Sequence, residues 1–273
     1  MKKLIVVLAS IFTCTFISHA AEVDTVVIYS KSMQKEMKCV VIKPSDKQAG
    51  KRWPVVYLLH GYSGNYSNWI TRVPQLMQHA DEYQLMIVCP DGGYSSWYFD
   101  SPADPTMRYE THIATEVPAY IDEHYPTIRD RAARAITGLS MGGHGGLFLG
   151  LRHADFFGAC GSMSGGVDLF ATKNKFDITK RLGDTSAHSD TWRYYSVINL
   201  IENYPKDSVA MIIDCGVDDF FFTDNRGLHE KLLRLKIPHE YIERPGAHNW
   251  AYWSNAVQFQ LLYFRNYFNR RKS

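Results

Sequence analysis

The segment from residue 133 to 149, AARAITGLSMGGHGGLF, constrains this chain most, because it reads as a buried strand, a sharp turn and a helix in direct succession. The apolar residues 135–137 suit a strand that is covered on both faces. Residues 138–142 follow as Gly-Leu-Ser-Met-Gly, a pattern in which a strained turn lifts the serine above the edge of a sheet. The small residues on either side let the strand and the helix pass closely. The segment therefore predicts that Ser140 is a nucleophile.

The five-residue pattern is weak evidence by itself. At average glycine and serine usage, it would occur by chance in about one chain of this length in ten. A serine nucleophile also needs a histidine that takes its proton and a carboxylate that orients the histidine. On a sheet of this kind the acid and then the histidine follow the serine along the chain.

Three aspartates and one histidine follow Ser140 in that order. Asp214 ends a predicted buried strand, whereas Asp218 and Asp219 lie in the turn beyond it, where functional loops of open α/β sheets gather. His248 lies in a Gly-Ala-His-Asn-Trp turn before the last predicted helix. We predict Ser140, Asp219 and His248 as the catalytic residues, with Asp218 as the open alternative for the acid.

Negative charge that develops on the acyl oxygen needs two backbone N–H donors. One is expected from the residue after the nucleophile, Met141. The other is expected from the turn at residues 60–64, His-Gly-Tyr-Ser-Gly, for which we favour the Tyr62 amide. The sequence thus predicts an oxyanion hole formed by Tyr62 and Met141.

The substrate surroundings are predicted from histidines and aromatic residues near these motifs. We expect His60, His144, Trp97 and Trp250 to line the substrate pocket, where aromatic rings could stack on a sugar or an aromatic acyl group. The competing explanation is that such rings belong to the core, which is their commoner place.

The rest of the chain alternates short apolar runs with helical patterns, which is typical of a mostly parallel sheet with helices on both faces. The polar stretch at 166–192 continues neither pattern, and we expect it to form a small lid-like excursion. With 273 residues, 45% of them hydrophobic, the chain suits a single large domain over 21–273. Strands are predicted at 24–29, 37–42, 54–60, 85–89, 135–137, 158–163, 209–215 and 240–243, and helices at 73–82, 109–124, 225–235 and 251–268.

The first 20 residues have the pattern of a secretory signal peptide. Lys2 and Lys3 precede an apolar run over residues 4–17, and Ser-His-Ala at 18–20 offers a cleavage site near Ala20. The apolar run is shorter than the roughly 20 residues that a membrane span needs. We therefore expect a periplasmic or secreted protein without a stable membrane anchor.

Charge and cysteine content exclude several kinds of partner. The chain has 30 basic and 28 acidic side chains, and loss of Lys2 and Lys3 with the signal would balance them. We expect no nucleic-acid partner, because no long basic block is present. Cys39, Cys89, Cys160 and Cys215 lack the close spacing of metal or redox sites, so neither metal nor cofactor is expected. Buried free thiols are the favoured state, and an exported protein could instead pair Cys39 with Cys89.

Six short blocks together carry a resemblance to a known family. They are Leu-Leu-His-Gly-Tyr-Ser-Gly at 58–64, Ser-Pro at 101–102, Tyr-Glu at 109–110, Gly-Leu-Ser-Met-Gly-Gly at 138–143, Cys-Gly-Val-Asp-Asp-Phe at 215–220 and Gly-Ala-His-Asn-Trp at 246–250. With these blocks the chain resembles the esterase D superfamily of α/β-hydrolases, which includes secreted acetyl xylan and feruloyl esterases, S-formylglutathione hydrolases and mycolyltransferases. The resemblance implies an α/β-hydrolase fold and places the acid at Asp219. One departure is Asn249, where relatives often carry aspartate.

The leading functional hypothesis is a secreted serine carboxylesterase that works through an acyl-enzyme. The resemblance implies a small-molecule or oligosaccharide ester as substrate, with an acetyl, short-chain or hydroxycinnamoyl group on carbohydrate. Two alternatives stay open: acyl transfer to a sugar hydroxyl, and an inactive carbohydrate-binding relative of such enzymes.

Overall fold

The structure is a computed structural model that describes residues 21–45, 50–172, 175–203 and 208–270. The predicted signal peptide at 1–20 lies outside the described residues. The strands are β1 (Glu22–Ser30), β2 (Lys35–Lys43), β3 (Val55–Leu59), β4 (Met86–Pro90), β5 (Arg134–Gly138), β6 (Ala159–Met163), β7 (Ala210–Gly216) and β8 (Glu240–Arg244).

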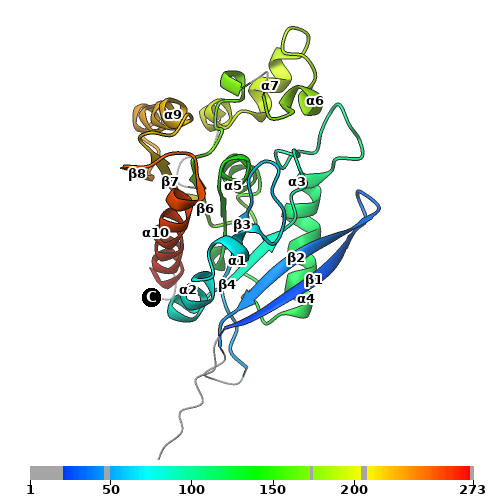
Figure 1. Ribbon diagram of the computed structural model, residues 1–273, viewed down its shortest axis with the longest axis vertical. Helices are drawn as coiled ribbons and strands as arrows, with labels where there is room; N and C mark the ends of the chain where they lie inside the picture. Colours follow the sequence, from blue (N-terminus) through cyan, green and yellow to red (C-terminus); the bar gives the residue numbers. More distant parts are fainter. Residues whose placement is uncertain (1–20, 46–49, 173–174, 204–207, 271–273) are drawn as a thin grey trace, which may run out of the picture.

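These eight strands form one sheet in the order β1-β2-β4-β3-β5-β6-β7-β8 (Figure 1). β1 and β2 pair as an antiparallel hairpin, and β2 also pairs antiparallel with β4. All other neighbouring strands are parallel. The central strands β3, β4, β5 and β6 are buried at every residue, which explains why β3 and β4 are nearly continuous apolar runs. The predicted fold class, a mostly parallel α/β-hydrolase sheet, is confirmed.

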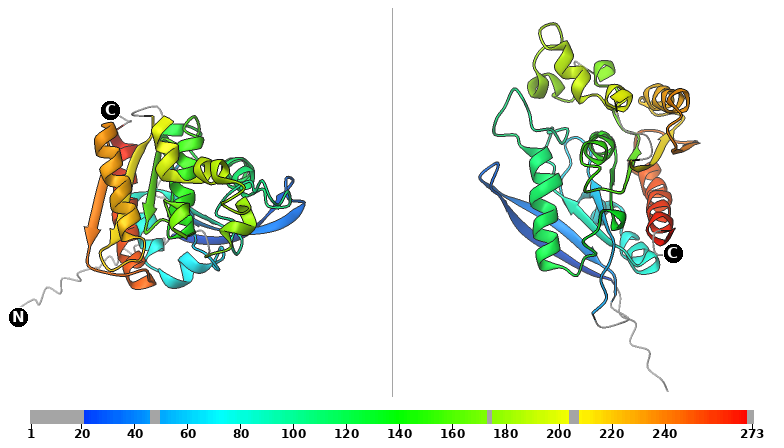
Figure 2. Two further views of the ribbon diagram at one scale, coloured as in Figure 1. Left: turned by 90° about the horizontal axis from the view of Figure 1, so that it is seen from above. Right: turned by 180° about the vertical axis from the view of Figure 1, so that it is seen from behind.

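Helices cover both faces of the sheet (Figure 2). One face packs against α4 (Val117–His124), α5 (Met141–Arg152) and α9 (Phe222–Leu235). The other packs against α1 (Asn68–Arg72), α2 (Leu76–Tyr83) and α10 (Trp250–Arg270). Parallel strands with helices on both faces bring the loops after β3, β5, β7 and β8 to one end of the molecule, where an open α/β sheet binds its ligands.

Two predicted helices differ in the structure because of prolines. The helix predicted at 73–82 is shorter and begins at Leu76, since Val73 precedes Pro74 and has a non-helical backbone. The short helix α1 before it was not predicted. The helix predicted at 109–124 consists of α3 (Tyr109–Thr111), a π-helical turn η1 (His112–Glu116) and α4. Pro118, in the first turn of α4, has no N–H to donate, and the wider turn accommodates this loss.

The excursion between β6 and β7 is longer than the predicted 166–192. It contains η3 (Leu169–Thr172), α6 (Ile178–Leu182), α7 (Ser189–Tyr195), α8 (Val197–Leu200) and η4 (Ile201–Asn203). Figure 1 shows α6 and α7 at the top of the view, above α5.

The four described cysteines are buried and free. Cys39 and Cys89 lie on neighbouring strands, but Cys39 packs into the core on the α4 side and Cys89 into the core on the α10 side. A bond between them is therefore excluded, because successive side chains of a strand point to opposite faces and these two thiols point apart. Burial raises the pKa of all four thiols, which keeps them protonated.

Candidate active site

Ser140 occupies the turn between β5 and α5 with φ 55° and ψ −117°, a conformation that costs a non-glycine residue energy. Two glycines make the turn possible. A Cβ on Gly138 or on Gly142 would lie 2.6 Å from the carbonyl oxygen of Leu59 on the neighbouring strand. The backbone of β3 thus passes too close for any side chain, and the elbow predicted from the sequence is present.

Ser140, His248 and Asp219 form one hydrogen-bonded chain. The Oγ of Ser140 lies 2.9 Å from Nε2 of His248, and Nδ1 of His248 lies 2.9 and 3.0 Å from the two carboxylate oxygens of Asp219. Asp219 is 5% exposed and Ser140 is 9% exposed. The aspartate therefore holds the imidazole so that Nε2 is available to accept the serine proton.

The other two candidates for the acid, Asp214 and Asp218, form no hydrogen bond with His248. Asp218 is exposed, and its backbone N–H donates to the Gly246 carbonyl. Asp214 is buried at the end of β7, where its carboxylate accepts hydrogen bonds from Arg244 and Tyr252. Neither carboxylate is hydrogen-bonded to His248, so the geometry favours Asp219 over both.

Two backbone N–H groups are available beside Ser140. Met141 is the first residue of α5, where an N–H has no acceptor within the helix. Tyr62 lies in the loop after β3, in which Ser63 donates to Tyr94 and Gly64 donates to Gly61, while the Tyr62 N–H has no backbone acceptor in the described chain. Neither N–H group is therefore used by a backbone hydrogen bond among the described residues, and both stay candidates for the donors that an oxyanion hole needs.

His60 is buried beneath the Tyr62 loop and does not line the cleft, in contrast to its predicted position. Its Nε2 accepts the Gly92 N–H at 2.7 Å, so Nδ1 carries the proton and donates to the Gly61 carbonyl at 2.8 Å. Burial lowers the pKa of His60 despite this carbonyl. A neutral His60 therefore orders the loop that carries Tyr62.

His144 and Trp97 are also buried away from the cleft, so their predicted place in the pocket is wrong. His144 follows Ser140 by one helical turn but points into the core, where its ring contacts Trp97, Phe99 and Phe148. Trp97 donates through Nε1 to the carbonyl of Phe176 at 2.9 Å and so supports a residue that does line the cleft. The sequence could not distinguish these core aromatics from pocket aromatics, because both follow the same local pattern.

A cleft of about 440 Å³ opens at Ser140 and His248. Trp250 lines it as predicted, together with Tyr62, which was predicted only for its amide. The sequence analysis did not predict the remaining lining residues, which come from several separate loops and helices. One signal was available for Phe220, because this residue directly follows the predicted acid Asp219. The remaining lining residues include Ser63, Asn68, Arg72, Leu139, Phe176, Phe220 and Trp253.

The aromatic residues form a continuous wall across this cleft. The ring centroid of Phe220 lies 4.1 Å from that of His248 and 6.2 Å from that of Phe176, on which it stacks. The ring centroid of Phe176 in turn lies 5.4 Å from that of Tyr62. Phe220 is 60% exposed, an unusual place for a large apolar ring unless it meets a ligand. The wall would shield the Ser140 hydroxyl from bulk water on one side.

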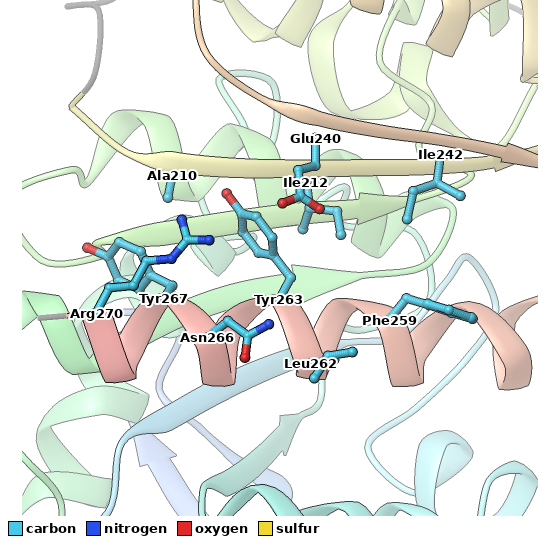
Figure 3. Close-up of a pocket in the computed structure, with 10 residues that line it drawn as sticks. All are labelled: Ala210, Ile212, Glu240, Ile242, Phe259, Leu262, Tyr263, Asn266, Tyr267 and Arg270. Atoms are coloured by element: carbon cyan, nitrogen blue, oxygen red, sulfur yellow. The ribbon is translucent and has the colours of Figure 1, made fainter.

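A second, smaller cavity of about 180 Å³ lies between α10 and the strands β7 and β8 (Figure 3). Figure 3 shows the rings of Tyr263 and Tyr267 rising from α10 toward the strands. Its lining side chains include Glu240 and Arg270 but no serine, cysteine or histidine. This cavity therefore lacks a nucleophile with its base, and the candidate active site is the cleft at Ser140.

Within the described ranges, no group of three or more His, Cys, Asp or Glu side chains is arranged to hold a metal ion. No helix in those ranges is long and apolar enough to cross a membrane.

Comparison with known proteins bears on this site. The family model described as "Putative esterase" matches residues 30–263. An acetyl esterase of Caldicellulosiruptor saccharolyticus is 26% identical over 258 residues, which cover 84% of this chain and 92% of that protein. An S-formylglutathione hydrolase of Bos taurus is 24% identical over 88% of this chain and 92% of its own length. The solved structure of a ferulic acid esterase is 29% identical, with a TM-score of 0.78, and the match covers 91% of this chain and 100% of that one.

The fold and these similarities define the protein as a serine carboxylic ester hydrolase with the α/β-hydrolase fold. The chain belongs to the esterase family whose model spans residues 30–263. The resemblance to the esterase D superfamily is thereby confirmed.

The buried His144 generates a prediction about acid stability. Burial among aromatic rings lowers its pKa to about 4, whereas the unfolded value is near 6.5. Between these values the unfolded chain binds a proton that the folded chain does not, so stability falls as the pH is lowered through this window. We expect His144→Gln to remove up to about 1.4 kcal/mol per pH unit of this slope. Urea unfolding at pH 6.5, 5.5 and 4.5 measures it, and equal slopes in both proteins would contradict the burial argument.

Proposed function

We propose that the protein is an exported esterase that hydrolyses small acyl esters of carbohydrate through an acyl-enzyme on Ser140. The observation that carries the proposal is the hydrogen-bonded chain of Ser140, His248 and Asp219 at the floor of a cleft. At about 440 Å³ the cleft is within the usual range for small-molecule sites.

The geometry supports a two-step reaction. Nε2 of His248 takes the proton of Ser140 as Oγ attacks the acyl carbon, and the resulting oxyanion accepts hydrogen bonds from the Tyr62 and Met141 amides. The imidazolium then gives its proton to the departing alcohol oxygen as the carbon–oxygen bond breaks. Water repeats the sequence on the acyl-enzyme, releases the carboxylic acid and returns the proton to Ser140. Asp219 stabilises the imidazolium in both steps.

The aromatic wall supports an acyl or sugar group that offers a flat or apolar face. Phe176 and Phe220 line the same cleft as Ser140 and could stack on a hydroxycinnamoyl ring or on the apolar face of a sugar. The relative named acetyl esterase is consistent with an acetyl group, and the relative named ferulic acid esterase is consistent with a hydroxycinnamoyl group. A panel of p-nitrophenyl acetate, butyrate and ferulate distinguishes them by the ratio of kcat/KM values.

The catalytic roles predict a sharp difference between two adjacent aspartates. Ser140→Ala should lower kcat for p-nitrophenyl acetate by at least about 10³-fold, and Asp219→Asn by roughly 10⁴-fold, because the imidazole loses its orienting carboxylate. Asp218→Asn, on the exposed neighbour, is the matched control and should stay within about twofold of the parent. Similar losses in both aspartate variants would remove Asp219 from the proposed site, and full turnover in Ser140→Ala would remove the mechanism.

Export is supported by the place of Ala21. Its backbone nitrogen donates to a carboxylate oxygen of Asp81 at 2.8 Å, and the other oxygen of Asp81 accepts the Ser45 N–H at 2.6 Å. Ala21 is buried. Cleavage after Ala20 would turn this nitrogen into an ammonium group that is already beside a carboxylate, so the processed chain would gain an ion pair at its first residue.

Processing after Ala20 is directly measurable. N-terminal sequencing of the exported protein should read Ala21, Glu22 and Val23. In the processed chain Asp81→Asn should cost about 1 kcal/mol more free energy of unfolding than in a chain with Gly-Ser added before Ala21, because only the former has the ammonium group at Ala21. A different first residue, or equal costs in the two chains, would contradict this part of the proposal.

A further inference from the structure

The short helix α1 contributes two polar side chains to the lining of the active-site cleft. Asn68 and Arg72 are its first and last residues, four positions apart, and therefore lie on one face of the helix. Both line the same cleft as Ser140 and His248. The helix is anchored by Trp69 between them, whose Nε1 donates to the Leu59 carbonyl at 2.9 Å. The side chains of Asn68 and Arg72 are thus carried by a helix that a hydrogen bond anchors to β3.

These side chains have donors without acceptors. The Oδ1 of Asn68 accepts the Asn65 N–H at 3.0 Å, which sets the amide orientation and leaves Nδ2 as the free donor. Among the described residues, none accepts a hydrogen bond from this Nδ2 or pairs with the guanidinium of Arg72. A cation in the last turn of a helix is favourable, but this does not require the side chain to face the cleft.

The charge of Arg72 is uncompensated inside the cleft. Among the described residues that line it, Arg72 is the only one with a formal charge, because Asp219 lies behind His248. The nearby Asp177 lies outside the lining and is paired with Lys180 at 2.8 Å. Since Trp250 and Trp253 give part of the cleft a low-dielectric wall, the field of this single cation is felt along it.

We propose that Asn68 and Arg72 form a subsite that binds a carboxylate carried by the ester substrate. A guanidinium can donate two parallel hydrogen bonds to a carboxylate, and the Asn68 amide adds a third donor. The inference rests on the esterase function proposed above and narrows its substrate to anionic esters. The carboxylate can belong to the alcohol, as in an acylated uronic acid, or to the acyl group, as in a monoester of a dicarboxylic acid.

Two matched pairs of esters distinguish a carboxylate on the alcohol from a carboxylate on the acyl group. The alcohol side is tested with 4-acetoxybenzoate against 4-acetoxybenzamide. The acyl side is tested with the p-nitrophenyl monoester of adipic acid against the same ester with a terminal carboxamide. We expect the parent protein to prefer the anionic member of one pair by roughly fivefold to twentyfold in kcat/KM, and this preference should shrink as salt is raised.

Substitutions of Arg72 test the subsite itself. Arg72→Gln should bring the anionic-to-neutral ratio close to one, and Arg72→Glu should reverse it. Arg234→Gln is the matched control, because Arg234 is likewise an exposed arginine in the last turn of a helix, α9, and pairs with no described residue. This control should keep the parent ratio. An unchanged ratio in Arg72→Gln, or no preference within either pair in the parent, overturns the proposal.

A binding measurement distinguishes failure of the proposed carboxylate subsite from failure of the proposed esterase function. If the parent hydrolyses the neutral esters without preferring an anionic one, the subsite is wrong and the esterase function stands. If the parent hydrolyses none of the esters, the esterase function is wrong, and calorimetry on Ser140→Ala with 4-hydroxybenzoate and monomethyl adipate judges the subsite. Binding that Arg72→Gln removes in the same background supports the subsite, and absence of binding overturns it.

Discussion

The close passage of three backbone segments at Ser140 is the constraint on which the rest of the site depends. The strand β3 runs so near to the elbow that a Cβ on Gly138 or Gly142 would meet its carbonyl oxygen at 2.6 Å. This contact holds Ser140 at φ 55°, a conformation that a free chain would leave. Because the same strand continues into the loop of Tyr62, this contact also fixes where that loop begins relative to the elbow that carries Met141. One packing contact thus sets both the nucleophile and its proposed oxyanion donors.

The acid and the histidine depend on a second junction at the ends of β7 and β8. Val217 and Asp218 donate backbone hydrogen bonds to Arg244 and Gly246, which joins the loop of Asp219 to the loop of His248. Behind this junction the buried carboxylate of Asp214 accepts from Arg244 and from Tyr252 on α10. A displacement of β7, β8 or α10 relative to the others would leave this buried carboxylate without its donors, which is energetically costly. Asp214 therefore acts as a positioning residue, although it does not touch the histidine.

The parallel sheet could be predicted from the sequence, and so could the proximity of Ser140, Asp219 and His248 in one hydrogen-bonded chain, because both follow local rules. Apolar runs mark the strands, and the order of serine, acid and histidine marks the loops. The pocket could not be read in this way. His144 and Trp97 have the residue types of a binding site but pack into the core, whereas Phe176 and Arg72 reach the cleft from an excursion and a helix that have no clear local pattern. Which aromatic ring faces solvent is decided by packing between distant segments.

The proposed reaction requires that His248 activates Ser140 and that the elbow holds the serine for attack on an acyl carbon. Labelling with a fluorophosphonate probe, followed by peptide mapping, tests it most directly, since the probe bonds only to a serine whose proton can be withdrawn. We expect one equivalent of probe on the peptide that contains Ser140, and labelling slowed by orders of magnitude in His248→Ala. Labelling at another serine, or unchanged labelling without His248, would contradict it.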